Sequence, residues 1–310
     1  MIQQNSPITF SLLGGLFDGL RPIETISPSD WADKYRILSP KASSTPGRWE
    51  TSRTPYLREI MDRFSPYDPC EEVVVMKGAQ VGMTEAGMNV MGYWIHIDPG
   101  SIFYIMPTVE TVKRNSKIRI DPMIESTPEL RKKIKVARSR EAGNTMLQKE
   151  FPGGVVYLAG ANSASGLASV PVGRIVLDEI DKYPGNVDKE GDPIKLAIVR
   201  TRTYPRRKIF MLSTPGEAET SRVAPAFDKT TQRKFHVPCP HCGYMQHLEF
   251  DWLRWEGDDP YTAQLLCQGC DGLVHEQNKY NMLAHGEWRD TVNKPGQVGD
   301  SRKIWGYHIN

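Results

Sequence analysis

The chain lacks the features of a membrane or secreted protein. None of its apolar runs reaches the roughly 18 residues that a transmembrane helix needs. Residues 1–20 contain a short apolar patch without a basic segment before it, so a signal peptide is not expected. Only five cysteines occur, and four of them form two CxxC pairs. This usage favours a metal site in a reducing compartment over disulfide bonds.

The composition also lacks an excess of either charge. The formal net charge is +2, so the molecule as a whole has no field that demands a polyanionic partner. Basic residues do cluster at 131–140 and 200–208. A solvated face is the more ordinary reading of such runs, and contact with nucleic acid or phosphate is the other. With 39% hydrophobic residues in 310, the chain is long enough for one large domain and a smaller module.

Apolar runs alternate with helical patterns between residues 71 and 215. We predict strands at 73–76, 101–106, 155–160, 174–178 and 208–214, and helices at 83–96, 108–119, 127–137 and 191–200. Most strand candidates are almost continuously apolar, as in a parallel sheet that is covered on both faces. The prediction is an α/β domain with a mostly parallel sheet and its ligand site at the carboxyl ends of the strands.

Changes in composition divide the chain further. Residues 1–55 are expected to form an N-terminal arm in which a capped helix follows Ser27, and residues 56–230 form the α/β domain. Residues 231–290 contain short strands around the cysteine pairs and form a separate small module. Residues 291–310 end in a strand-like run, and we expect them to begin a linker or a truncated further domain.

The segment VVVMKGAQVGMT at 73–84 places a glycine-spaced turn between a strand and a helix. A phosphate loop has this order, because its glycines let backbone N–H groups face the phosphates while a lysine neutralises them. Met83 occupies the usual lysine position, and Lys77 instead stands where the first glycine would be. Thr84 is placed to bind Mg²⁺. Taken alone, an ordinary strand-to-helix turn is the more common explanation of such a segment.

A second apolar run, RIVLDE, ends in two adjacent carboxylates. Asp178 is predicted to hold Mg²⁺, directly or through water, and Glu179 to orient the water that attacks a γ-phosphate. Carboxylates at a strand end are common, but their occurrence about 95 residues after a lysine-bearing glycine loop is much rarer. The combination favours ATP hydrolysis. Ser213 and Thr214 end the next strand and are predicted to sense the γ-phosphate, although this is also an ordinary turn.

The cysteine pairs have the spacing of two zinc knuckles. They are Cys239, Cys242, Cys267 and Cys270. Four thiolates complete a tetrahedral Zn²⁺ site, so a structural rather than a catalytic metal is predicted. His241 lies inside the first pair and is expected to point outward.

Together these segments resemble the large terminase subunit of tailed bacteriophages, in its lambda-like, GpA-type branch. The resemblance covers roughly residues 25–310 and is carried by SPSDWADKYRILSPKASSTPGRW, KGAQVGMT, RIVLDEIDKYP, KIFMLSTP and VPCPHCGYMQHLEF. It implies an ASCE-type P-loop NTPase with a zinc-ribbon-like module that drives double-stranded DNA into a preformed capsid in the host cytoplasm. It also implies a ring of subunits, with the portal protein and the terminase small subunit as partners. The segment 291–310 would then begin a truncated nuclease domain, and we expect no nuclease activity.

The resemblance also assigns roles to residues. The altered Walker A segment, expected to bind ATP, would consist of Lys77, Gly78, Ala79, Gln80, Val81, Gly82, Met83 and Thr84. Asp178 and Glu179 would form Walker B, and Ser213 with Thr214 the coupling motif. Tyr56 falls near the family's adenine-contacting segment, where a packing role is equally compatible. The candidates for an arginine that acts on a neighbour's nucleotide are Arg138, Arg140, Arg200 and Arg202.

Two departures and two alternatives accompany this interpretation. Gln80 stands where many relatives carry a basic residue. Met83 favours a non-hydrolysing nucleotide fold with a zinc-ribbon module that binds DNA or protein, whereas Lys77 and Glu179 oppose it. A host helicase-like ATPase is disfavoured because a second helicase-type lobe is missing from the sequence. DNA contact is expected to be non-specific and salt-sensitive, with residues 131–140 and the cysteine module as candidate surfaces.

Overall fold

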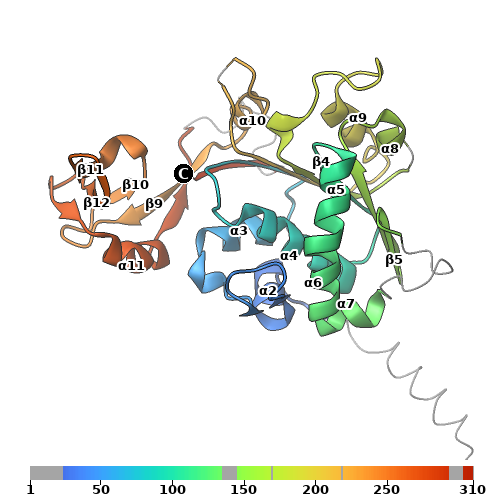
Figure 1. Ribbon diagram of the computed structural model, residues 1–310, viewed down its shortest axis with the longest axis horizontal. Coiled ribbons are helices and arrows are strands. Elements are labelled where there is room, and N and C mark those ends of the chain that lie inside the picture. Colours follow the sequence, from blue (N-terminus) through green and yellow to red (C-terminus); the bar gives the residue numbers. More distant parts are fainter. Residues whose placement is uncertain (1–23, 135–144, 169, 218, 293–302, 310) are drawn as a thin grey trace, which may run out of the picture.

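A computed structural model describes residues 24–134, 145–168, 170–217, 219–292 and 303–309 (Figure 1). Its centre is a ten-stranded sheet, and a three-stranded sheet lies in a smaller lobe, at the left of Figure 1. Within the described ranges, no helix is long and apolar enough to cross a bilayer.

Parallel strands form the middle of the large sheet. In order they are β15 (Ile304–Ile309), β3 (Glu72–Lys77), β8 (Lys208–Ser213), β7 (Arg174–Asp178), β4 (Ile102–Met106) and β6 (Gly154–Gly160). β5 (Gln148–Phe151) pairs antiparallel with β6 at one edge. The mostly parallel α/β class is confirmed, and each predicted strand agrees with the structure to within one residue at either end.

Both faces of this sheet are buried. Along β3, Val73 and Val75 pack into one apolar cluster, whereas Val74 between them packs into the other. The first cluster is covered by α2 (Pro28–Tyr35), α3 (Tyr56–Asp62), α4 (Met83–His96), α6 (Asp121–Ser126) and α7 (Pro128–Lys133). The second is covered by α8 (Ala164–Ala168), α9 (Pro193–Val199) and α10 (Val223–Phe227). Burial on two faces explains why the strands are apolar at consecutive positions.

The predicted helices are present with altered ends. α4 has the predicted bounds, and α9 begins two residues later and ends one residue earlier than the predicted 191–200. The helix predicted at 108–119 is α5 (Val109–Asn115), continued by a π-helical segment, Ser116–Ile120. α7 covers the beginning of the predicted 127–137 helix, and residues 135–137 lie outside the described ranges.

Residues 24–55 pack onto the α/β domain. The Ser27 side chain caps α2 by accepting a 3.2 Å hydrogen bond from the Asp30 N–H. Trp31 in this helix is fully buried, and its indole donates a 3.0 Å hydrogen bond to Nδ1 of His96. The ring lies so close to Gly92 of α4 that a Cβ there would come within 2.4 Å of it. The remaining elements of this segment are short: β1 (Ile37–Leu38), β2 (Gly47–Arg48) and the 3₁₀ turn η1 (Thr51–Arg53).

The smaller lobe is an insertion between two strands of the large sheet. β9 (Arg233–Pro238) leads out of the sheet and β14 (Glu287–Arg289) returns antiparallel to it, so we call these the root strands. The metal module is the segment between them, residues 239–286. It contains β10 (Met245–His247), η4 (Phe250–Trp252), β11 (Leu253–Glu256), β12 (Asp259–Leu266), β13 (Leu273–Val274), η5 (Glu276–Asn278) and α11 (Lys279–Ala284).

The strand after the metal module rejoins the large sheet. β15 lies between β9 and β3 and runs parallel to both, with Ile304 opposite Glu72 and Ile309 opposite Lys77. We assigned residues 291–310 to a linker or a truncated nuclease domain, and within this range the structure places Ile304–Ile309 in the sheet of the α/β domain. The metal module is therefore inserted between two strands of one sheet.

Candidate nucleotide site and metal centre

Lys77 lies at the centre of a cluster formed by three strand ends. It is the last residue of β3, and its side chain is only 6% exposed. Nζ lies 2.8 Å from Oε1 of Glu179 and donates a 3.0 Å hydrogen bond to Oγ1 of Thr214. Because β3, β8 and β7 are parallel neighbours, their carboxyl ends bring these three residues together.

The loop after Lys77 presents backbone N–H groups at the start of a helix. Gln80 and Gly82 adopt left-handed conformations, with φ of 58° and 77°. The Gly78 N–H donates a 2.8 Å hydrogen bond to the carbonyl of Ile309, which anchors the loop to β15. Gly82 precedes α4, and Thr84 lies in the first turn of that helix. The first N–H groups of a helix lack intrahelical partners and attract anions.

Met83 is a core residue in the structure. Its side chain is 1% exposed and belongs to the apolar cluster beneath the loop. The position that holds a lysine in an ordinary phosphate loop is thus occupied here by a residue of the apolar core. Lys77 supplies a cation from the end of β3 instead.

Asp178 ends β7 and is almost fully buried. The Tyr104 hydroxyl on β4 donates a 3.1 Å hydrogen bond to its Oδ2. Burial, followed by repulsion from Glu179, raises the pKa of Asp178 to about 6, although Tyr104, Lys77 and the Thr84 hydroxyl act in the opposite direction. Within the described part of the chain, its Oδ1 is buried and accepts no hydrogen bond of normal geometry. A buried carboxylate oxygen beside a hydroxyl suits Mg²⁺, which prefers oxygen ligands.

Glu179 follows Asp178 in a left-handed conformation, with φ of 60°. Such a conformation is strained for a residue with a Cβ and is typical of functional sites. Burial would raise the pKa of its carboxyl, but hydrogen bonds from Lys77 and Lys182 lower it below the ordinary value. Lys182 Nζ lies 3.0 Å from Oε2. Glu179 is therefore an ionised carboxylate that can polarise a water molecule.

Asp181 joins this turn to the segment after β8. The buried Ser213 Oγ accepts a 3.1 Å hydrogen bond from the Asp181 N–H. The Asp181 carboxylate accepts hydrogen bonds from the backbone N–H groups of Gly216, Arg222 and Val223, at 2.8, 3.1 and 2.7 Å. Sequence reasoning overlooked this residue, although its place in DEID was a signal. It also overlooked Tyr104, whose position opposite Asp178 depends on how the strands align.

Of the candidate arginines that the structure describes, neither Arg200 nor Arg202 joins the cluster around Lys77. Arg200 ends α9, and its carbonyl accepts a hydrogen bond from the N–H of Val172, just before β7 begins. It thus lies at the amino ends of the strands, whereas Asp178 lies at their carboxyl ends. Arg202 is exposed and follows it closely in the chain. Arg138 and Arg140 lie outside the described residues.

Tyr56 packs beneath the loop at the start of α3. Its hydroxyl donates a 3.2 Å hydrogen bond to the carbonyl of Val81, and its ring meets Phe235 of β9 edge-on at 5.8 Å. The side chain is 8% exposed, and this burial raises its pKa. Its contacts in the structure are therefore those of a packing residue that also supports the loop.

The four cysteines of the metal module converge. All four sulfur atoms lie within 4.8 Å of one another, and the Sγ atoms of Cys242 and Cys267 are 3.7 Å apart. Zn–S bonds of about 2.3 Å in a tetrahedron place sulfurs about 3.8 Å apart, so this donor set suits Zn²⁺. The ring of His241 turns instead to the backbone, with Nε2 3.2 Å from the carbonyl of Leu273.

The two cysteine pairs form matching turns. The residue after each pair, Gly243 or Asp271, is left-handed and donates its N–H to the carbonyl of the first cysteine at 2.9 or 3.0 Å. The N–H groups of His241 and Gly269 point at the sulfurs of Cys239 and Cys267. Such N–H···S contacts favour thiolates, which are the form that binds a metal.

Sequence comparisons relate this arrangement to known proteins. Residues 43–288 match the family described as phage terminase large subunit gpA, ATPase domain. The chain is 28% identical over 275 residues to the terminase large subunit of Enterobacteria phage P21, covering 86% of this chain and 42% of that protein. It is also 28% identical over 270 residues to the terminase large subunit of Escherichia phage lambda, covering 84% and 42%. The chain thus spans about two fifths of the length of these relatives.

A structural comparison supports the fold. The crystal structure of the HK97 bacteriophage large terminase is similar with a TM-score of 0.51 and 11% sequence identity, covering 66% of this chain and 41% of that one. At this identity the similarity concerns the fold alone.

Proposed function

Because the chain belongs to the family of phage terminase large subunit gpA ATPase domains, we propose that it hydrolyses ATP to move double-stranded DNA into a procapsid. The contact of Lys77 with both Glu179 and Thr214 carries the proposal, because it joins a cation, a carboxylate and a hydroxyl at one strand edge. Phosphoryl transfer needs such groups held in position around the γ-phosphate.

The described residues suggest a division of roles. Lys77 and the N–H groups of residues 78–84 bind the β- and γ-phosphates. Thr84 and Asp178 hold Mg²⁺, which neutralises the phosphate charge when it is bound. When Lys77 binds a phosphate oxygen, this oxygen takes the place of the Glu179 carboxylate as its partner. The carboxylate can then orient the attacking water.

Loss of the γ-phosphate can be transmitted through the segment after β8. Lys77 Nζ contacts both Thr214 and Glu179, so a ligand that moves Lys77 also changes the hydrogen bond to Thr214. Asp181 ties the turn that carries Glu179 to Gly216 and to the start of α10. We therefore assign Ser213 and Thr214 to coupling, with Asp181 as a positioning residue.

The partners follow from the family. The similar proteins of phages P21 and lambda are terminase large subunits, which supports a ring of subunits acting with a portal protein and a terminase small subunit in the host cytoplasm. DNA contact is through phosphates and weakens with salt. The four cysteines hold a structural Zn²⁺. Arg200 and Arg202, remote from this chain's own Lys77, remain candidates for acting on a neighbouring subunit's nucleotide.

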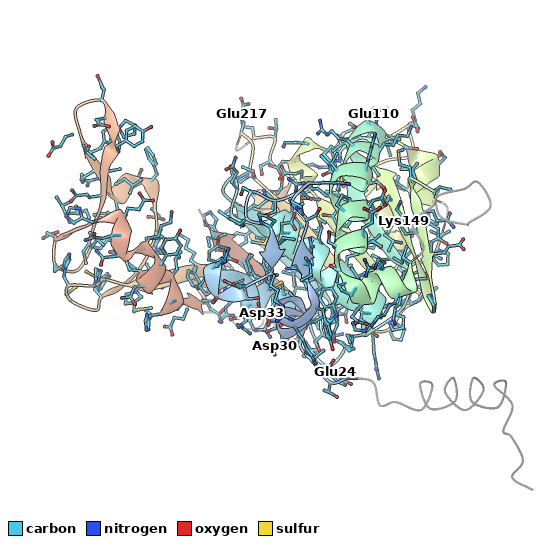
Figure 2. The ribbon with its side chains drawn as sticks, turned by 60° about the horizontal axis from the view of Figure 1, so that its bottom comes forward. Glu24, Asp30, Asp33, Glu110, Lys149 and Glu217 are labelled. Atoms are coloured by element: carbon cyan, nitrogen blue, oxygen red, sulfur yellow. The ribbon has the colours of Figure 1, made fainter. Side chains whose placement is uncertain are left out.

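The test is ATP hydrolysis by the wild-type chain beside Glu179→Gln, with and without linear double-stranded DNA. Loss of the base that orients water should lower the rate about 10²–10⁴-fold. Glu110→Gln is the matched control, since this glutamate is exposed on α5 (labelled in Figure 2) and should keep the wild-type rate. Equal turnover by the wild type and Glu179→Gln would sink the assignment and favour a nucleotide fold that does not hydrolyse ATP.

A further inference from the structure

A cavity of about 320 Å³ lies beside the phosphate loop. Its walls come from the loop at Ala79–Val81, from Tyr56, from the ends of β9 and β15, and from the metal module through Lys279 and Leu283. Its volume falls at the lower end of the range of small-molecule sites, about 300–1,000 Å³. Two parts of the chain far apart in sequence thus meet over one hollow.

The cavity lies on the side of the loop away from the carboxylates. In the sheet, β3 has β8 and β7 on one side, and these strands carry Thr214, Asp178 and Glu179 at their ends. On its other side is β15, whose last residue, Ile309, lines the cavity. A nucleotide with its phosphates over the loop therefore has its catalytic groups on one side and open space on the other.

We propose that this cavity takes the base and ribose of the bound nucleotide, and that α11 of the metal module supplies its outer wall. The inference rests on the proposed ATPase function and adds a second part of the chain to its substrate site. It gives the metal module a role in nucleotide binding, beyond any role in DNA contact.

The lining suits a nucleoside. Apolar surface from Val81, Leu248 and Leu283 can cover the faces of a planar base. Hydrogen-bond donors are available from Gln80 and Lys279 for ring nitrogens and ribose hydroxyls, whereas Lys234 is paired with Glu249. No carboxylate is among the described lining residues.

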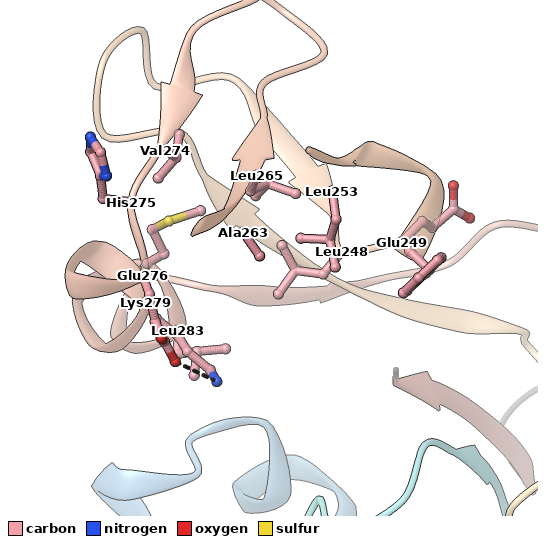
Figure 3. A pocket seen from close by; sticks show the side chains of 12 residues that line it. Leu248, Glu249, Leu253, Ala263, Leu265, Val274, His275, Glu276, Lys279 and Leu283 are labelled. Carbon is pink, nitrogen blue, oxygen red and sulfur yellow. Dashed lines mark ion pairs between the residues drawn. The ribbon is translucent and has the colours of Figure 1, made fainter. Parts of the chain in front are cut away.

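Lys279 is free to serve a ligand. Its side chain is more than half exposed, and its ion pair with Glu276 is long, at 3.9 Å. Figure 3 shows this pair beside Leu283, at the end of the metal module that faces the α/β domain. Lys279 and Leu283 line both this cavity and the apolar cavity inside the module, so α11 lies between the two hollows.

A continuous set of contacts joins the metal module to the loop. Trp288 of β14 donates a 3.0 Å hydrogen bond from its indole to the backbone carbonyl of Tyr56. The ring of Phe235 in β9 contacts the rings of Tyr56 and Trp288, at centroid distances of 5.8 and 5.2 Å. Tyr56 in turn holds the carbonyl of Val81 in the loop. The root strands and the phosphate loop therefore form one packed unit.

The metal centre positions α11 on this unit. The helix follows Cys270 through β13, which pairs with β12, and the carbonyl of Leu273 in β13 contacts the ring of His241 from the other cysteine pair. A metal that joins the two pairs thus restrains the segment that leads to Lys279. Because linkage between two binding sites is reciprocal, metal and nucleotide should each strengthen the binding of the other.

The experiment compares two ligands by isothermal titration calorimetry on the zinc-loaded 310-residue chain. MgADP has a base and ribose, whereas magnesium tripolyphosphate has neither. Lys279→Ala should bind MgADP about five- to tenfold more weakly and tripolyphosphate as the wild type does. Arg254→Ala, an exposed change in the same module away from the cavity, should alter neither affinity. Removal of zinc by a chelator should reproduce the selective loss of MgADP affinity.

Two results would overturn the inference. One is an unchanged MgADP affinity in both Lys279→Ala and the zinc-free chain. The other is an equal loss of affinity for both ligands, which would indicate an effect on the phosphates rather than on the nucleoside. Lys77→Ala tests the proposed function separately, because it should weaken both ligands. Unchanged binding of both to that variant would contradict the phosphate site itself.

Discussion

The sheet of the α/β domain and the metal module are stabilised in different ways. Every residue of β4 and β8 is buried, because helices cover both faces of that sheet. In the metal module β11 is largely exposed, and the Tyr261 side chain of β12 is 96% exposed. Apolar burial stabilises a fold by about 25 cal/mol per Å², so it is a strong term in the first region and a weak one in the second. The difference teaches that the metal module depends on its four cysteines.

Removing the metal should unfold only one of the two regions, and this is the largest change in stability that we expect. Structural Zn²⁺ contributes about 10–16 kcal/mol in small metal-dependent domains, so chelation should unfold the metal module. Amide hydrogen exchange should then be fast at Cys239 and Cys267 and remain slow in β4 and β8. Cys70→Ser is the control, since this buried cysteine lies outside the cluster and its loss should leave the metal content unchanged. Full protection of the metal module after chelation would contradict the comparison.

Asp178→Asn should show the cost of placing a charge in the buried region. The pKa of this carboxyl is about 6 in the folded chain and 3.8 in its ordinary state. The protonated carboxyl therefore favours the folded state. This contribution to the free energy of unfolding is complete below about pH 3.8 and is lost as the pH rises through about 6. Asparagine removes the charge, so the variant should be more stable than the wild type at pH 7 by about 1–3 kcal/mol.

Urea unfolding without Mg²⁺, at pH 5 and pH 7, measures this effect. The advantage of Asp178→Asn over the wild type should shrink at pH 5, where the aspartic acid is mostly protonated. Asp258→Asn, an exposed change in the metal module, should follow the wild type at both pH values. An advantage of the same size at both pH values would show that Asp178 does not titrate in this range.

Tyr56→Phe tests the boundary between the two regions and should give the smallest effect. Phenylalanine keeps the ring contact with Phe235 but loses the hydrogen bond to Val81. The free energy of unfolding should fall by about 0.5–1.5 kcal/mol, measured in urea. Tyr67→Phe, at a tyrosine that is 74% exposed, should be neutral. A decrease in the free energy of unfolding several times larger would mean that the hydroxyl stabilises the loop through more than its hydrogen bond to the Val81 carbonyl.

The strands and the places of Lys77 and Glu179 at strand ends could be predicted because each depends on a local pattern, whereas the contact between the two side chains comes from the structure. Burial on both faces leaves continuous apolar runs, and a lysine or carboxylate at the end of such a run must lie at the ligand edge of the sheet. The position of β15 beside β3 could not be predicted, since pairing across the metal module leaves no local signal. The contact between Trp31 and Gly92 and the hydrogen bond from Tyr104 to Asp178 likewise depend on how distant segments pack.

The position of β15 has a consequence for the order in which the chain folds. During synthesis, β3 pairs with β8 on one side, and its other edge stays open until residues 304–309 have emerged. A disordered insertion at residues 239–286 would make that closure slower and entropically more costly. A metal-bound insertion whose ends are already paired as β9 and β14 shortens the effective loop. The cysteine centre thereby acts on assembly of the nucleotide-binding sheet, before any nucleotide is present.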